Sequence, residues 1–167
     1  MFGVSSDRTV GALARSKPQT EFPNLTVITL AGSSLSAVLH TWEASAAEMA
    51  VHMTAQCNLL VFGIGALKRD SVLRQPPHLY CTERGHNIAA GASAVALGRF
   101  IDGAEHKAAG PLSGSAMAIS PDAAQFTPIR LGVCSGATKC DAVRSAAAAG
   151  LLIIVVVTAS RTGTFLN

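Results

Sequence analysis

The chain has 167 residues, of which 49% are hydrophobic and 14% are charged. This composition excludes an intrinsically disordered chain and provides enough apolar residues for one buried core. The net charge is +3, and the basic residues are scattered along the chain without an aromatic-basic cluster, which argues against direct nucleic-acid binding. We therefore expect one globular domain that spans residues 1–167.

The predicted elements alternate between strands and helices. In chain order they are a strand end at 1–6, a helix at 8–15, a strand at 25–30, a helix at 42–55, a strand at 58–62, a stretch at 88–100 that fits either type, a short strand at 115–119 and a helical turn at 121–125. Strands that alternate with helices indicate an open α/β sheet.

The stretch from Arg130 to Thr158 is the most informative part of the chain. A strand at 129–133 precedes Ser135-Gly136, and Thr138 is a candidate helix cap. An alanine-rich helix at 137–149 follows and ends at Gly150. The next segment, Leu151–Val157, is apolar at every position, which predicts a parallel strand buried on both faces. Together with the earlier elements, this unit predicts an open, Rossmann-like α/β sheet of about five mostly parallel strands.

Glycines and hydroxyl residues follow several of the predicted strands, where α/β proteins bind ligands. Free N–H groups at the helix starts favour anions such as phosphate. The candidate ligand-binding residues are Gly3, Ser5, Ser6, Arg8, Thr9, Gly32, Gly63, Gly65, Gly136 and Lys139. The alternative is that the glycines only permit tight turns. The GxG at Gly63 is not a dinucleotide fingerprint, because Lys68 stands where the third glycine would be.

Few residues qualify for catalysis or metal binding. The five histidines lack metal-ligand spacing, and the four cysteines form no CxxC pair, so we expect free buried thiols, no metal and no cofactor. Cys134 lies near a helix start, which can lower a thiol pKa, but no base stands beside it in the sequence. Asp70 and Asp102 are the only modest candidates for a general acid or base. We therefore expect no catalytic residue and no enzyme activity.

The sequence has few features that indicate a cellular location. No basic and apolar leader follows Met1. The apolar run at 151–157 is shorter than the roughly 20 residues that cross a bilayer. We expect a cytoplasmic protein without membrane contact.

Five stretches, in this order, resemble the sugar-binding effector domain of SorC-type, DeoR-related bacterial transcriptional regulators. They are GVSSDRT at 3–9, LTVITLAGS at 25–33, LLVFGIGALKRDS at 59–71, GASAVALGRFID at 91–102 and the unit at 130–158. The resemblance implies a three-layer α/β domain related to sugar-phosphate isomerases. It also implies a phosphorylated sugar as the effector and DNA as a partner only through a helix-turn-helix domain, which this segment lacks.

The resemblance also assigns roles to residues. The loop from Gly3 to Thr9 would hold the phosphate, Lys139 would contact it, and Gly63 and Gly65 would let the backbone approach the ligand. Three sites depart from the family pattern: Asp7 replaces a glycine, Ala94-Val95 replaces Gly-Asp, and Ala159-Ser160 replaces an acidic pair.

These observations favour a ligand-sensing domain of a carbohydrate-responsive regulator. One alternative is a degenerate remnant that acts only as an oligomerisation module, with apolar surface left uncovered by shortened segments. The other is an enzyme similar to the sugar-phosphate isomerases. In each case we expect a homo-oligomer.

Overall fold

The computed structural model describes residues 1–5, 8–16, 23–30, 49, 52–54, 56–67, 85, 87–102 and 118–157. Five parallel strands form its central sheet in the order β2-β1-β3-β6-β7. Their bounds are β1 Phe2–Val4, β2 Val27–Thr29, β3 Leu59–Ala66, β6 Ile129–Val133 and β7 Ile154–Val156. The predicted open, mostly parallel α/β sheet is confirmed.

The second half of β3 extends beyond the parallel sheet and pairs with an antiparallel hairpin. The hairpin consists of β4 (Ala92–Ala96) and β5 (Arg99–Asp102), and β4 pairs with β3 from Ile64 to Ala66. Leu97 and Gly98 form its two-residue turn, with φ angles of 54° and 71°, the backbone of a tight type I′ turn. With the two strands of the hairpin, the described part of the chain forms a sheet of seven strands.

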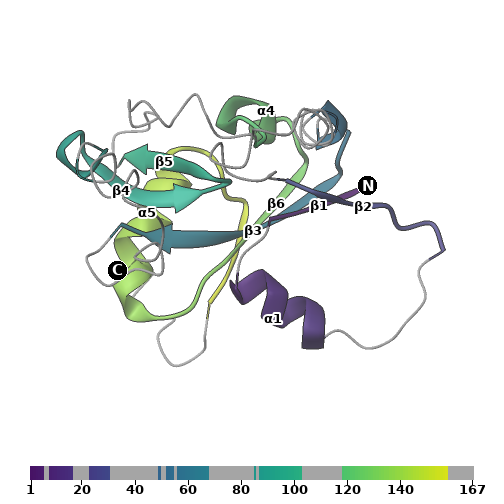
Figure 1. Cartoon of the computed structure of the whole chain (residues 1–167), viewed down its shortest axis with the longest axis horizontal. Coiled ribbons are helices and arrows are strands. Elements are labelled where there is room, and N and C mark those ends of the chain that lie inside the picture. Colours follow the sequence, from purple (N-terminus) through teal and green to yellow (C-terminus); the bar gives the residue numbers. More distant parts are fainter. Residues whose placement is uncertain are drawn as a thin grey trace, which may run out of the picture.

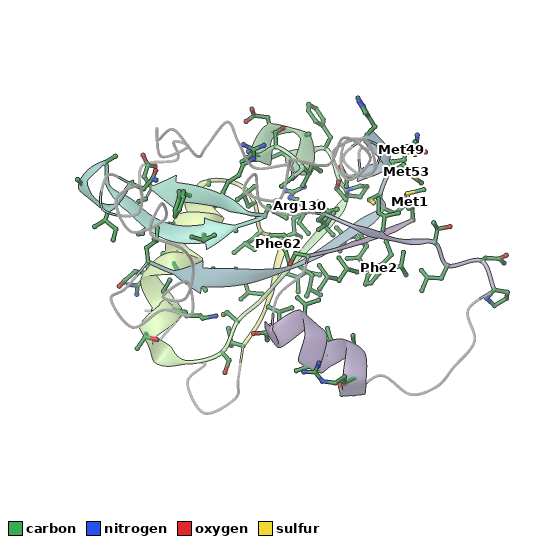
Figure 2. All side chains as sticks on the ribbon, in the orientation of Figure 1. Met1, Phe2, Met49, Met53, Phe62 and Arg130 are labelled. Atoms are coloured by element: carbon green, nitrogen blue, oxygen red, sulfur yellow. The ribbon has the colours of Figure 1, made fainter. Side chains whose placement is uncertain are left out.

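Side chains on the two faces of the sheet belong to different apolar clusters. Leu60, Phe62 and Ile64 of β3 are fully buried in the main core. Val61 and Val133 belong to a second cluster, beneath Val10 of the helix α1 (Arg8–Ser16). We call these the core face and the α1 face. In Figure 2, Phe62 of the core face and Phe2 of the α1 face lie on opposite sides of the sheet.

Helices lie on both faces, which gives the expected three layers. Figure 1 shows α1 on one side of the sheet and α4 (Pro121–Gln125) on the other. The helix α5 (Cys140–Ala148) packs on β3 and on the hairpin. A hydrogen bond of 2.5 Å between the hydroxyl oxygens of Ser93 on β4 and Ser145 on α5 joins them. α5 is therefore held against the hairpin.

Several predicted elements are confirmed, including β1, α1, β2, α4 and β6. The predicted helix at 42–55 lies mostly outside the described residues, but Met49 and residues 52–54 are helical. In the stretch at 88–100, which fitted either type, both are present, because a helical turn at 87–89 precedes β4 and β5. Of the predicted strand at 115–119, only Ala118 forms a described bridge.

Three predictions are wrong. The strand expected to end before Gly63 continues to Ala66, because pairing with β4 extends it. Thr138 does not cap α5, since residues 137–139 form a 3₁₀ turn (η3) and Lys139 occupies the N-cap position without a side-chain capping bond. β7 is not buried on both faces: all three residues are exposed.

The apolar run at 151–157 is therefore not the sign of a strand that is buried on both faces. β7 lies at the edge of the sheet and pairs only with β6 among the described strands. None of the described helices is long and apolar enough to span a bilayer.

Candidate ligand site at the carboxyl ends of the strands

The strand order places a topological switch point between β1 and β3. From β1 the chain proceeds outward to β2, whereas from β3 it proceeds the other way, to β6 and β7. Ligands of open α/β sheets bind outside the carboxyl ends of the strands at such a point. In this chain the switch point lies beside Ser5, directly after β1, and Gly63 within β3.

Ser5 joins the two strands at this point. Its backbone N–H donates to the carbonyl of Val61 at 2.9 Å, and its Oγ accepts a hydrogen bond from the backbone N–H of Gly63 at 3.2 Å. The Ser5 hydroxyl keeps its own proton and can still donate it to a ligand oxygen. The N–H of Gly63 is engaged within the protein, so Ser5 is the better-placed donor of the two.

The loop after β6 approaches β3 from the other side. Gly136 has a φ of 96°, a left-handed conformation that glycine adopts without steric cost. The η3 turn at 137–139 follows and lies against β3. Lys139 is partly buried and stands at the start of α5. The ammonium charge therefore lies near the positive end of a helix dipole, and both attract an anion.

The remaining candidates differ in placement. Gly3 lies inside β1, where a Cβ would collide with the side chains of Leu30 and Leu60. A glycine is therefore needed at this position for close packing on the core face. Thr9 is partly buried in the first turn of α1 and Arg8 begins that helix. Ser6, Gly32 and the Arg8 side chain lie outside the described residues.

Gly65 faces Val95 across the β3–β4 pair, and a Cβ there would meet Val95 at an ordinary 3.6 Å. Val95 belongs to a small apolar cluster with Leu67, Ala92 and Phe100. The residue that faces Gly65 is therefore the apolar Val95, at the position where the resemblance implies an aspartate. Close packing does not require the glycine at position 65.

The structure also places the other residues that sequence analysis considered. Asp102 ends β5 and is partly buried, while Asp70, Asp7 and Ala159 lie outside the described residues. In the part of the chain that is described, no group of three His, Cys, Asp or Glu side chains could hold a metal ion. Cys57, Cys134 and Cys140 are free and buried, as predicted.

The pKa of the Cys134 thiol is raised, which is opposite to the lowering that a nearby helix start can cause. Burial raises the pKa of this thiol, the positive charge of Lys139 lowers it in part, and Cys140 raises it further. Desolvation outweighs the nearby cation because the side chain is almost completely buried. Cys134 is therefore held as a neutral thiol and is poorly suited to act as a nucleophile.

Cys134 should accordingly be unreactive in the folded protein. We expect negligible labelling by a maleimide at neutral pH and rapid labelling after unfolding in urea. Because the pKa is higher in the folded state, stability should be full below the pKa of the unfolded thiol and should fall as the pH rises through the alkaline range. Urea titrations of the wild type and Cys134→Ala measure this loss, and an identical pH dependence in both proteins would contradict it.

Sequence analysis did not anticipate the contact between Ser93 and Ser145, which holds α5 against the hairpin. Isolated serines give no spacing signal, so only the fold reveals the pair. The Leu97-Gly98 turn was also missed, although the glycine between two short β-compatible runs was a usable signal.

The three comparisons with known proteins concern the fold. No family model matches the sequence, and no curated protein matches it. The structure is similar to a DeoR family transcriptional regulator from Listeria monocytogenes, with a TM-score of 0.83 at 14% identity, covering 99% of this chain and 78% of that one.

Two further solved structures are similar. One is a domain of a possible sugar-binding transcriptional regulator from Arthrobacter aurescens TC1, with a TM-score of 0.78 at 15% identity, covering 99% of this chain and 78% of that one. The other is the full-length sorbitol operon regulator SorC from Klebsiella pneumoniae, also with a TM-score of 0.78 at 15% identity, covering 99% and 65%. Likenesses at these identities establish the architecture, and so the chain has the fold of the effector domains of SorC- and DeoR-type transcriptional regulators.

Proposed function

We propose that residues 1–167 form a single effector domain of a carbohydrate-responsive transcriptional regulator and that this domain binds a phosphorylated sugar. The regulator would act in the cytoplasm and would contact DNA through a separate helix-turn-helix domain. The likeness to a possible sugar-binding regulator over 99% of the chain supports the sugar. The placement of Lys139 at the start of α5, in the η3 turn that lies against β3, carries the proposal for the phosphate.

The chemistry of the site suits a phosphate monoester. Lys139 supplies a positive charge, the first turn of α5 supplies backbone N–H groups, and the Ser5 hydroxyl can donate a hydrogen bond. We propose that Ser6, Arg8, Thr9, Gly32 and Gly136 line the same site. No step of bond breaking is required of these residues, because sensing needs only that the ligand bind one state of the domain better than another.

Replacing Lys139 with alanine is expected to weaken binding of the sugar phosphate by at least about tenfold, since hydrogen bonds to charged groups contribute about 1.5–3 kcal/mol. Isothermal titration calorimetry with hexose and pentose phosphates, their unphosphorylated sugars and inorganic phosphate measures this loss. We expect heat from at least one phosphorylated sugar and none from its unphosphorylated form.

Arg144→Ala is the matched control. Arg144 also carries a positive charge on α5, but it is exposed and its nearest ion-pair contact is Asp141, at 3.9 Å. The Arg144 variant should bind like the wild type. Absence of heat with every compound would refute ligand sensing by this domain, and equal losses in the two variants would refute the assignment of Lys139.

A further inference from the structure

Two serine hydroxyls link the hairpin to the first turn of α5. The Ser145 hydroxyl on α5 donates to the backbone carbonyl of Asp141 at 3.0 Å, and the hydroxyl oxygens of Ser93 and Ser145 lie 2.5 Å apart. A serine hydroxyl has one proton to donate. Because Ser145 gives its proton to Asp141, Ser93 is the donor in the bond between the two serines. The hydrogen bonds therefore run from β4 through Ser145 to the second residue of α5.

A β-bulge directs the Ser93 side chain toward α5. The pairing of β4 with β5 skips Ser93, which is the extra residue of the bulge. Strict alternation would place its side chain with Val95, in the small apolar cluster of the hairpin and Leu67, yet it reaches Ser145 on α5. Bulges redirect side chains in this way, often next to active sites. The Ser93 backbone stays in the sheet, because its carbonyl accepts a hydrogen bond from the N–H of Leu67 at 3.2 Å, directly after β3.

The two parts of the proposed anion site are both attached to β3. Ser5 is attached directly, because its Oγ accepts a hydrogen bond from the N–H of Gly63 at 3.2 Å. Lys139 is attached through α5, which begins there without a side-chain capping bond. Helix ends without a cap fray, so the position of Lys139 depends on how the first turn of α5 is held. The bonds from Ser93 and Ser145 hold that turn against the strand next to β3.

We propose that Ser93 is a positioning residue of this site, which holds the first turn of α5, and with it Lys139, in place relative to Ser5. The inference rests on the proposed function, because Lys139 and Ser5 are the anion donors assigned there. Ser93 acts through Ser145 and needs no contact with the ligand. A donor that is already held loses less conformational entropy on binding, so the hydroxyl of Ser93 should raise the affinity for the phosphorylated sugar.

Ser93→Ala is expected to weaken binding of a sugar phosphate about three- to tenfold, which corresponds to the loss of one ordinary hydrogen bond. Isothermal titration calorimetry of the full chain, with the hexose or pentose phosphate that the wild type binds most tightly, measures the change. The variant should fold, because alanine stands on both sides of Ser93 in β4 and Ser145 keeps Asp141 as its acceptor. In the ligand-free protein, the amide NMR signals of Lys139 and Asp141 should shift.

Ser145→Ala and the double variant test whether Ser93 acts through Ser145. Alanine favours a helix more than serine does, so a loss of affinity in Ser145→Ala would not come from unfolding of α5. We expect about the same loss as for Ser93→Ala, and no further loss when both serines are replaced. If the losses multiply in the double variant, Ser93 acts independently of Ser145 and the proposal is wrong.

Ser120→Ala is the matched control. This change also removes one hydroxyl hydrogen bond, because the Ser120 Oγ accepts from the N–H of Ala123 at 3.1 Å and caps α4. α4 precedes the amino end of β6, whereas Lys139 follows its carboxyl end. The Ser120 variant should be less stable but should bind like the wild type, and equal losses of affinity at Ser120 and Ser93 would contradict the proposal. Wild-type affinity in Ser93→Ala would overturn this inference alone, whereas a wild type that binds no sugar phosphate would overturn the proposed function with it.

Discussion

Replacing Leu97 with alanine is expected to lower the free energy of unfolding by about 2–5 kcal/mol, as for other large-to-small changes in a core. Leu97 is 2% exposed and packs in the main core cluster. Yet its φ of 54° lies in the left-handed region, which costs a residue with a Cβ about 1–2 kcal/mol. Leu97→Gly loses the same packing and one more carbon, but it is relieved of this strain. We therefore expect the glycine variant to be as stable as the alanine variant or more stable.

Urea unfolding of both variants measures this order. Leu60 is the matched control, because it is also a fully buried leucine of the main core but lies within the regular strand β3. There, glycine should be less stable than alanine by about 0.5–1 kcal/mol, the usual penalty in a strand. If alanine were more stable than glycine at both positions, the left-handed conformation of Leu97 would have no effect on stability, and the prediction would be wrong.

Replacing Gly132 with alanine is expected to destabilise the protein by about 1–3 kcal/mol, the usual cost of overpacking a core. A Cβ at this position of β6 would lie 2.5 Å from the Leu152 Cδ2 and 2.8 Å from the Ile64 Cδ1. Both neighbours belong to the packed core face, so their side chains must shift. Thermal and urea unfolding report the loss as a lower melting temperature and midpoint.

Gly65→Ala is the matched control, because it makes the same glycine-to-alanine change at another strand position. Gly65 is also a strand glycine, but an added Cβ would meet only Val95, at 3.6 Å. This variant should retain the stability of the wild type within about 0.5 kcal/mol or gain slightly, since alanine reduces the entropy of the unfolded chain. Equal losses at the two positions would contradict the packing argument.

Sequence analysis was most successful for elements that are determined by residues close together in the chain. The alanine-rich segment before Gly150 predicts α5, and Pro121–Gln125 predicts α4, because capping residues and helix propensity act within one turn. The parallel sheet follows from strands that alternate with helices. These local patterns, together with the resemblance in short motifs, led to a fold that the solved structures confirm.

The errors arise where distant parts of the chain decide the outcome. Gly63 and Gly65 are typical of a strand end, but pairing with β4 carries β3 past both of them. The apolar run of β7 is typical of a buried strand, yet whether it is buried depends on which helices cover it. Of the candidate site, Ser5 follows β1, Gly63 lies within β3 and Lys139 follows β6, and their role in ligand binding stays a prediction. The need for a glycine at position 3 could not be predicted, because it depends on Leu30 and Leu60, which come from other parts of the chain.

The position of β1 has a consequence for how this chain acquires its structure. β1 contains residues 2–4 yet lies inside the sheet, between β2 and β3, and β3 in turn pairs with β6 at residues 129–133. During synthesis β1 must therefore wait for Leu59–Val61 before it gains its second neighbour, and the parallel sheet cannot close until β6 and β7 have been made. Such long-range pairing makes folding slow and leaves apolar strands such as β3 exposed in the meantime. During that interval the nascent chain should depend on chaperones more than a helical protein of the same length does.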